Sequence, residues 1–223
     1  MSQRLIDLSY PLDDNTPFYA GLPAAEITVH ASIPAEHPPG TPGAGNMSSL
    51  KTNLHVGTHM DAPFHFYHHG PTIDQIDLRR CMGPALLIDL THKQANEPIT
   101  AAELQPYAEA MRTTNKVILR TGWARYWGEP SYFNDHPDIS PEAARFLVAA
   151  GVDLVGVDTP SVDKPPFATH FVLLGANLLI VENLANLDQI GRDRFHFTAL
   201  PLKISGRDAS PVRVIALVDN GEC

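Results

Sequence analysis

The sequence predicts a single α/β domain over residues 1–223, with a mixed sheet and flanking helices. Three observations support this prediction. Short, continuous apolar runs recur in the second half of the chain, as in strands that are covered on both faces. Helix start signals stand between those runs, and alternation of strands with helices is typical of α/β folds. The composition, 43% hydrophobic and 18% charged over 223 residues, provides enough apolar material for one core.

The first part of the chain is predicted to form short strands separated by long loops. Arg4–Leu8 and Glu26–His30 are predicted as short strands. Ser48–Val56 alternates loosely between apolar and polar residues, so we expect a strand that leads into the segment after it. Tyr10–Pro23 is punctuated by prolines, and Pro34–Gly45 is rich in proline and glycine, so both are predicted loops.

The middle of the chain contains two buried strands and two helices. Ala85–Leu90 and Lys116–Thr121 are apolar runs of strand length. Between them, a Thr-x-x-Glu capping box predicts a helix over Thr100–Arg112. A serine N-cap followed by a proline at the first helical position predicts a second helix from Ser140 to Ala150, which a glycine then stops.

The last part of the chain continues the alternation. Val152–Val157 is predicted as a strand, Thr169–Gly175 as a helix and Leu178–Val181 as a further strand. Phe195–Leu202 and Val212–Val218 are predicted to close the chain as strands. The alternation without an internal repeat or a linker favours one continuous sheet.

Charge and cysteine content argue against several classes of function. The net charge of −9 argues against a nucleic-acid partner, because binding to phosphates needs a clustered basic surface. The longest apolar stretch, Phe171 to Val181, is too short to span a membrane. The chain has only two cysteines, and no secretory leader is visible, so we expect a cytoplasmic protein without a disulfide framework. A small-molecule substrate is the expected partner.

The densest functional signal is a segment in which His55, His59, Asp61 and His65 all occupy odd positions. In an extended backbone side chains alternate between two faces, so these four would point the same way. Pro63 opposes a helix here, because it removes a backbone donor and biases the preceding residue toward extended conformations. Imidazole nitrogens and a carboxylate that converge on one point are what a metal site requires. The segment therefore predicts a metal centre where a strand runs into a turn.

A metal centre built from one segment is usually incomplete, so we expect ligands from distant parts of the chain. The two candidates are His170, near the start of a predicted helix, and Glu182, at the end of an apolar strand. Ligands bind at the carboxyl ends of strands in α/β sheets, and a partly buried carboxylate there needs a cation or hydrogen bonds. Asp158 and Asp163 are expected to shape a loop by accepting backbone hydrogen bonds.

The remaining histidine and aromatic residues are given expected roles from their neighbours in the sequence. His65 is either a further ligand or a proton-transfer group, for which an imidazole is suited because it titrates near neutral pH. Phe64, Phe66 and Tyr67 flank it and are candidates for an apolar wall. Trp123 and Trp127 are expected to pack within the protein. Structural or solvent-exposed positions are expected for His30, His37, His68, His69, His92, His136 and His196.

Taken together, these residues resemble a known family. Positions 55–65 read His-x-Gly-Thr-His-x-Asp-x-Pro-x-His, positions 158–163 read Asp-Thr-x-Ser-x-Asp, and His170 and Glu182 follow. This order and spacing resemble the family of cyclases and bacterial kynurenine formamidases, which includes arylformamidases and isatin hydrolase. The resemblance extends from Asp7 to about Leu187, and therefore over most of the chain.

The resemblance implies two divalent metal ions per chain, with zinc favoured and manganese as the alternative. It implies that His65 is a general acid/base rather than a ligand. The implied ligands are His55 and His59 for one ion, His170 for the other, Asp61 as a bridge between the two, and Glu182 as a further carboxylate for the pair.

The resemblance also implies a swivelling β/β/α architecture and a homo-oligomer, either a dimer or a tetramer. Formamidases usually carry a tryptophan in a Thr-Pro-x-Trp segment, and this tryptophan stacks on the aryl substrate. Here the corresponding residues are Thr16-Pro17-Phe18-Tyr19, so Phe18 and Tyr19 are the candidate substrate contacts. The tyrosine is a departure that leaves specificity for kynurenine compounds open.

The expected function is that of a metal-dependent hydrolase of a small amide, with an arylformamide such as N-formylkynurenine as the first substrate to test. One alternative is a lactam hydrolase similar to isatin hydrolase, or a related cyclase or lyase that uses the same metals. A second alternative is a non-haem iron oxygenase built on His59, Asp61 and a distant histidine. A third is a metal-binding module without catalytic activity.

Overall fold

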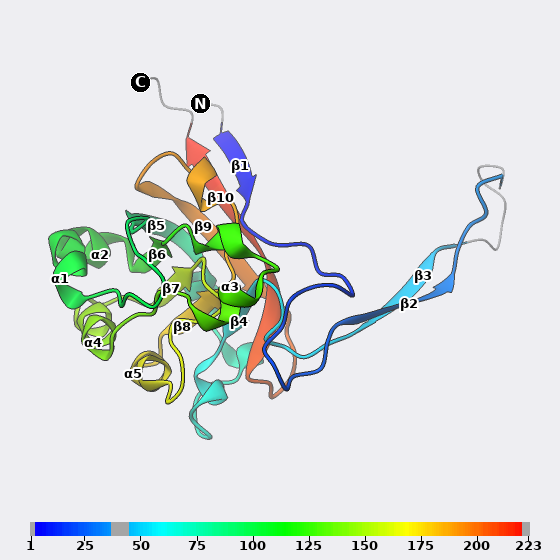
Figure 1. Ribbon diagram of the computed structural model, residues 1–223, viewed down its shortest axis with the longest axis horizontal. Helices are drawn as coiled ribbons and strands as arrows, with labels where there is room; N and C mark the ends of the chain where they lie inside the picture. Colours follow the sequence, from blue (N-terminus) through cyan, green and yellow to red (C-terminus); the bar gives the residue numbers. More distant parts are fainter. Residues whose placement is uncertain (1–2, 37–44, 220–223) are drawn as a thin grey trace.

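The protein is built on one eight-stranded mixed sheet, which curls so that seven of its strands form a closed ring (Figure 1). The computed structural model describes residues 3–36 and 45–219. The strand order is β1-β10-β4-β8-β7-β6-β5-β9, and β9 also pairs with β10, which closes the ring. The strands of this sheet are β1 (Gln3–Asp7), β4 (His59–Asp61), β5 (Met82–Asp89), β6 (Lys116–Arg120), β7 (Leu154–Val157), β8 (Leu179–Glu182), β9 (Arg194–Pro201) and β10 (Ala209–Asp219).

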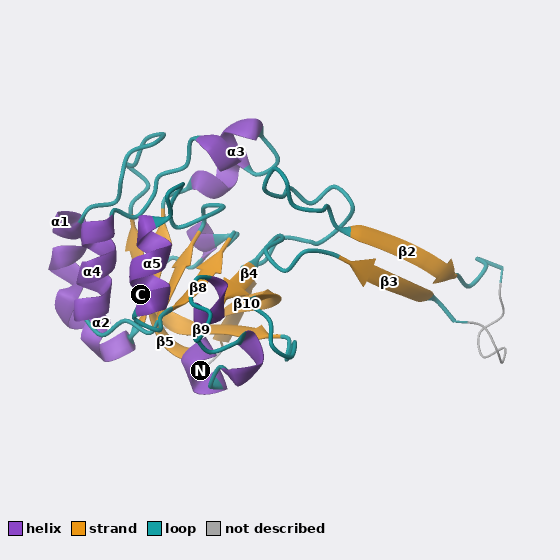
Figure 2. Ribbon diagram, turned by 90° about the horizontal axis from the view of Figure 1, so that it is seen from below, coloured by secondary structure: helices purple, strands orange, loops and turns teal. Residues whose placement is uncertain are grey.

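Helices cover one side of this ring, where α1, α2, α4 and α5 lie together (Figure 2). The α-helices are α1 (Ala101–Leu104), α2 (Ala108–Thr114), α3 (Pro130–Asn134), α4 (Pro141–Ala149) and α5 (Ala168–Gly175). Short 3₁₀ turns occupy the connections, namely η1 (Pro63–His65), η2 (Ile73–Gln75), η3 (Leu78–Cys81), η4 (Gln105–Tyr107), η5 (Trp123–Tyr126) and η6 (Leu187–Gln189).

Alternating side chains along the parallel strands β5 to β8 create two hydrophobic cores. Leu87 and Ile118 pack with Phe197 and other residues from strands all around the ring, and so fill its interior. Their neighbours Leu86 and Val117 point the other way and pack against the helices. Full burial of such a side chain stabilises the fold by about 1.5–3 kcal/mol. The strand ends that carry the site described below are therefore anchored from both sides.

A two-stranded arm projects from this body (Figures 1 and 2). It consists of β2 (Glu26–Ala31) and β3 (Met47–Lys51), whose residues are all exposed and which, among the residues described, pair only with each other. Val29 is 65% exposed and Met47 is 64% exposed, which is unusual for large apolar side chains on a strand. The arm lacks the packing that holds the eight-stranded sheet, and an isolated hairpin is only marginally stable in water.

The predicted α/β class with a mixed sheet is confirmed, and so are the helix starts after Thr100 and Ser140. The prediction of one helix over Thr100–Arg112 was wrong, because Pro106 has no backbone N–H and a 3₁₀ turn separates α1 from α2. The predicted strand Ser48–Val56 ends at Lys51 instead. There the Asn53 side chain accepts the N–H of His55 at 2.9 Å, and such a local bond competes with strand pairing.

Some predictions fall on residues that the structure does not describe. Residues 37–44 of the predicted loop Pro34–Gly45 are among them, and so are His37 and Cys223. Within the described residues, no helix is long and apolar enough to cross a lipid bilayer.

Candidate metal centre

The short strand β4 places the first two residues of the site. It lies between β8 and β10, and all three of its residues are buried. His59 and Asp61 are two residues apart on an extended strand, so they project from the same face. In the antiparallel pairing with β8, His59 lies directly opposite Glu182. The register of the sheet thus brings a carboxylate from a distant part of the chain to the histidine motif.

His55 and His65 reach the same place from irregular backbone, rather than from the extended strand that we expected. His55 lies in the loop before β4, where Gly57 turns the chain with a positive φ of 56°. His65 ends the 3₁₀ turn η1. Pro63 begins this turn, because the first position of a helical turn needs no N–H donor. Ala62 before it is extended, with φ −98° and ψ 158°, so a strand does run into a turn here, as predicted, and the turn is a short 3₁₀ turn.

His59 and His170 are each held through one ring nitrogen. His170 lies in the first turn of α5, and its Nδ1 is 2.6 Å from Oδ1 of Asp163. The other oxygen of Asp163 accepts the backbone N–H groups of Thr169 at 2.6 Å and of His170 at 3.2 Å. Nδ1 of His59 is 2.9 Å from the carbonyl oxygen of Gly57. Holding Nδ1 in this way turns Nε2 toward the site, as second partners of metal-binding histidines do.

The two carboxylates divide the cluster into two halves. Oδ1 of Asp61 is 2.9 Å from Nδ1 of His55 and 3.5 Å from Nε2 of His59, whereas Oδ2 is 3.8 Å from Nε2 of His170. Glu182 has the same arrangement, with Oε2 3.4 Å from Nε2 of His59 and Oε1 3.6 Å from Nε2 of His170. Each carboxylate therefore offers one oxygen to the His55–His59 half and one to the His170 half.

Unsatisfied polar atoms show that this cluster fits a cation. Among the described residues, Nε2 of His59 and both carboxylate oxygens of Asp61 are buried without a directed hydrogen bond. An unsatisfied buried polar group costs about 1–3 kcal/mol, and more when it is charged. Histidine nitrogens and carboxylate oxygens are ligands that zinc and manganese both accept.

The charges in the cluster are strongly coupled. Burial alone would raise the pKa of Asp61, but the nearby imidazoles of His55 and His170 hold it well below its ordinary value. Burial would lower the pKa of His55, yet Asp61 and Asp208 raise it to about 10. Burial would likewise lower the pKa of His170, and Asp163 together with Asp61 raises it to about 10. A cation in the cluster therefore replaces protons that these imidazoles otherwise carry.

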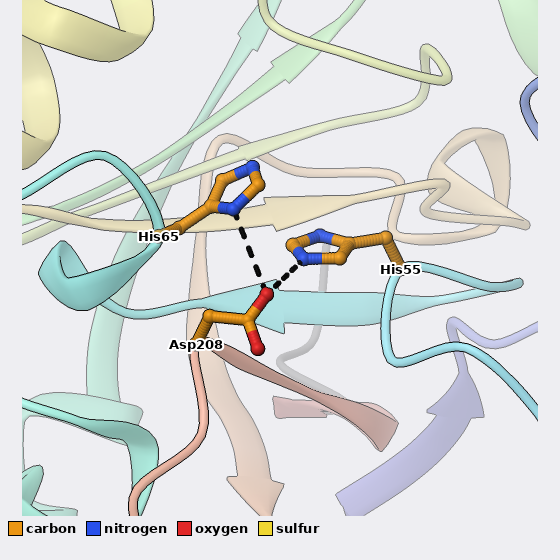
Figure 3. A group of neighbouring side chains, drawn as sticks. All are labelled: His55, His65 and Asp208. Carbon is orange, nitrogen blue, oxygen red and sulfur yellow. Dashed lines mark hydrogen bonds and ion pairs between the residues drawn. The ribbon is translucent and has the colours of Figure 1, made fainter. Parts of the chain in front are cut away.

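Asp208 is a residue of the site that the sequence did not reveal. Its Oδ2 is 2.7 Å from Nε2 of His55 and 3.6 Å from Nδ1 of His65 (Figure 3). The two imidazoles hold the pKa of Asp208 well below its ordinary value. Asp208 follows an ordinary loop and belongs to no motif, so only the pairing of β10 with β4 brings it to the histidines.

The cluster forms the floor of a cavity of about 330 Å³. Phe66 stacks on His170 with ring centroids 4.9 Å apart, and Tyr19 and Phe167 add aromatic surface. Burial and the charge of Glu182 raise the pKa of Tyr19, so its phenol stays protonated. Phe18 does not line this cavity and instead borders a separate hollow beside Phe133. The residues that line the cavity are Tyr19, Ala20, Leu22, His55, His59, Asp61, His65, Phe66, Ser161, Phe167, His170 and Glu182.

A larger hollow of about 620 Å³ lies elsewhere, between Tyr10, Arg120 and Asp188. We place the chemistry in the smaller cavity, because all groups of potential metal ligands among the described residues lie in or beside it. Size alone does not identify a reactive site, whereas converging polar groups do.

Several other predicted positions agree with the structure. Asp158 accepts hydrogen bonds from Thr121 and Gly122, as expected of a loop-shaping residue. Trp127 packs in a stack with Tyr10, and Trp123 is buried. His136 is fully buried, and burial lowers its pKa to about 4. Exposed positions are found for His30, His68, His69 and His92, while His196 is partly buried. The apolar wall includes Phe66, whereas Phe64 and Tyr67 lie outside the cavity.

The chain matches known proteins over most of its length. A family model described as Putative cyclase matches residues 6–164. A kynurenine formamidase of Bacillus thuringiensis (strain Al Hakam) is 32% identical over 217 residues, which cover 94% of this chain and 95% of that protein. A kynurenine formamidase of Bacillus anthracis is 31% identical over 221 residues, covering 96% and 97%.

Solved structures show the same architecture. Isatin hydrolase A from Labrenzia aggregata, bound to benzyl benzoate, superposes with a TM-score of 0.84 at 26% identity, covering 97% of this chain and 94% of that one.

Proposed function

This chain belongs to the cyclase family, and from that membership we propose that it is a metal-dependent hydrolase of a small aryl amide or lactam. The observation that carries the proposal is the arrangement of Asp61 and Glu182, each of which offers one oxygen to each half of the histidine cluster. A single ion in the His55–His59 half would leave Oδ2 of Asp61 without a partner, whereas Oε1 of Glu182 also accepts the N–H of Val162 at 3.1 Å. An iron oxygenase built on two histidines and one carboxylate would likewise leave Glu182 unexplained.

We assign one divalent cation to His55 and His59, a second to His170, and both to the carboxylates of Asp61 and Glu182. Zinc is the first expectation and manganese the alternative, because this ligand set accepts both ions. Such ions lower the pKa of water toward about 7 and polarise a carbonyl group. The protein orients the ligands through Asp163, the Gly57 carbonyl and the sheet register.

His65 is the group that we assign to proton transfer. It lies at the edge of the cluster, with a ring nitrogen within 4.8 Å of an Asp61 oxygen and a His170 nitrogen. It is partly exposed, whereas His59 and His170 are nearly fully buried, so it can exchange protons with the cavity. An imidazole at this position can take a proton from the attacking water and return one to the leaving nitrogen.

The cavity walls favour an aromatic substrate. Phe66, Phe167 and Tyr19 provide apolar surface beside the polar floor. The relatives named kynurenine formamidase support an arylformamide such as N-formylkynurenine as the substrate. The structures of isatin hydrolase support the alternative, a lactam fused to an aromatic ring, and a metal-dependent cyclase or lyase is a further alternative on the same site. Because position 19 is a tyrosine, the site does not decide between an arylformamide and a lactam. A comparison of kcat/KM for the two substrate classes distinguishes them.

The decisive variant for this function is His65→Ala. We expect kcat to fall by about 10²–10⁴-fold, because a proton-transfer group is lost, while the metal content stays at the wild-type value. Elemental analysis and turnover of N-formylkynurenine and isatin, followed by absorbance, measure both quantities. Turnover near the wild-type rate would remove His65 from the mechanism, and loss of metal would make His65 a ligand instead. His68→Ala is the matched control, since His68 is an exposed histidine outside the cavity.

We also propose that the protein is a homo-oligomer, a dimer or tetramer, in which the β2–β3 arm contacts another copy of the chain. The exposed apolar residues of the arm support this, because a lone hairpin of such composition gains stability only from a partner. The cytoplasm is the location that we propose, on the grounds of the low cysteine content.

A further inference from the structure

We propose that Asp208 is a positioning residue that orients two histidines at once, the metal ligand His55 and the proton-transfer residue His65. This inference rests on the proposed function, since it concerns the same site. Figure 3 shows one carboxylate oxygen between the two rings, 2.7 Å from Nε2 of His55 and 3.6 Å from Nδ1 of His65. The rings themselves are 4.1 Å apart and inclined by 35°, so one carboxylate reaches both.

The backbone holds Asp208 in place relative to the histidine motif. Its carbonyl oxygen accepts the N–H of Ala62 at 2.9 Å, and the next residue, Ala209, pairs with Asp61 across the sheet. The carbonyl oxygen of Arg207 accepts the N–H of Ile73 at 2.8 Å. Asp208 lies immediately before β10, and these backbone hydrogen bonds tie it to the segment that follows β4.

Asp208 gives His55 an orientation opposite to that of the other two histidine ligands. His59 and His170 are held through Nδ1 and present Nε2 to the carboxylates of the cluster. His55 is held through Nε2 by Asp208 and presents Nδ1 to Asp61. A hydrogen-bonded second nitrogen fixes both the tautomer and the ring plane of a metal-binding histidine. Among the described residues, Asp208 is the one hydrogen-bond partner of Nε2 of His55, so the choice of Nδ1 as ligand atom depends on it.

The same oxygen sets the direction of His65. Because Nδ1 of His65 faces Asp208, the other ring nitrogen points away from the carboxylate, as Figure 3 shows. At 3.6 Å this contact is too long for a full hydrogen bond, whereas the contact to His55 is a short one. Asp208 therefore orients His55 more strongly than His65. Its removal is expected to affect both metal binding and turnover.

The first test is the tautomeric state of the histidines in the zinc-loaded protein. Long-range ¹H–¹⁵N spectra of the imidazole rings distinguish Nδ1–H from Nε2–H. We expect Nε2–H for His55 and Nδ1–H for His59 and His170. Nδ1–H at His55 would overturn the proposal. This measurement uses the wild-type chain, so it needs neither a substrate nor a variant that folds.

The second test compares Asp208→Asn with Asp74→Asn. Asp74 is a matched control, because it also anchors this loop, by accepting the N–H of Gly206 and the hydroxyl of Thr72, but touches no histidine. We expect Asp208→Asn to weaken zinc binding by about 10–100-fold in chelator competition, and to lower kcat at saturating zinc with little change in KM. Asp74→Asn should leave both at wild-type values.

Three outcomes of this comparison are informative. Loss of thermal stability alone, with unchanged zinc affinity and kcat, would make Asp208 a purely structural residue and overturn the proposal. Rescue of zinc affinity by Asp208→Glu, which restores a carboxylate, would support it. If the wild-type protein hydrolyses neither N-formylkynurenine nor isatin, the proposed function fails, yet zinc affinity and tautomers still decide the role of Asp208.

Discussion

Three histidines of the cluster are each held by a hydrogen bond to the ring nitrogen that faces away from the cluster. Asp163 holds His170, the Gly57 carbonyl holds His59, and Asp208 holds His55. The sequence motif identifies which residue types meet, but these anchors decide which nitrogen atom is presented. At this scale the chemistry depends on single hydrogen bonds of 2.6–2.9 Å rather than on burial alone.

The raised pKa values of His55 and His170 predict that metal binding is coupled to protons. Both pKa values are about 10 in the metal-free protein, so both rings are doubly protonated imidazolium cations at pH 7. A metal ion binds only the neutral imidazole, and each site must therefore release a proton. We expect zinc affinity to rise as the pH increases from 6 to 8. Calorimetric titration in buffers of different ionisation enthalpy measures the protons released, and binding that is independent of pH would contradict this prediction.

At the residue scale, the sequence predicted the members of the cluster better than their geometry. His55, His59, Asp61, His65, His170 and Glu182 all line the cavity. The shared strand face was correct for His59 and Asp61 alone, because a loop and a 3₁₀ turn carry the other two. Asp208 could not be predicted, since its role depends on pairing between strands far apart in the chain. Tyr19 lines the cavity, whereas Phe18 lies outside it, so Phe18 as a substrate contact stays a prediction.

Two elements position the distant half of the site. The antiparallel pairing of β4 with β8 fixes Glu182 opposite His59. The first turn of α5 presents His170, and Asp163 accepts two backbone N–H groups of that turn. A carboxylate at the start of a helix satisfies donors that have no partner within the helix. Asp163 thus has two roles, since it caps the start of α5 and orients the ring of His170.

Asp163→Asn tests this link between an element and the site. We expect it to weaken zinc binding by about 10–100-fold and to lower the free energy of unfolding by about 1 kcal/mol. Ser140→Ala is the matched control, because Ser140 caps α4 through the N–H of Ala143 and lies outside the cavity. The control should lose similar stability without a change in zinc affinity. Equal zinc affinity in both variants would show that Asp163 only caps a helix.

The elements themselves were predictable where local signals agreed with tertiary packing. The apolar runs became β5 to β8, since strands covered on both faces need apolar residues throughout. Pro106 split a predicted helix, and the Asn53 side chain ended a predicted strand early. The closed ring could not be predicted, because it depends on the pairing of β9 with β10. The short helix α3 was not predicted.

In the whole molecule, the ring and the arm differ in how they are stabilised. The ring has a core on each side, whereas the arm buries none of its residues. Domains rarely leave such apolar surface in water, and a second copy of the chain is the partner that we propose.

Val29→Asp on the arm tests this assembly. We expect sedimentation equilibrium to give a dimer or tetramer for the wild-type chain and a smaller species for the variant, because a buried charge at an interface is costly. Asp188→Asn, an exposed change on the body, is the control. A monomeric wild-type protein, or a variant with unchanged mass, would exclude the arm as the contact.

The central claim is that this fold holds two divalent ions between Asp61 and Glu182. The most direct measurement is elemental analysis of metal per chain, on protein purified without chelator or added metal. We predict about two zinc or manganese ions per chain in the wild-type protein, falling in Asp61→Asn because that variant loses a bridge between both halves. A single iron per chain, or no metal even after titration, would contradict the account.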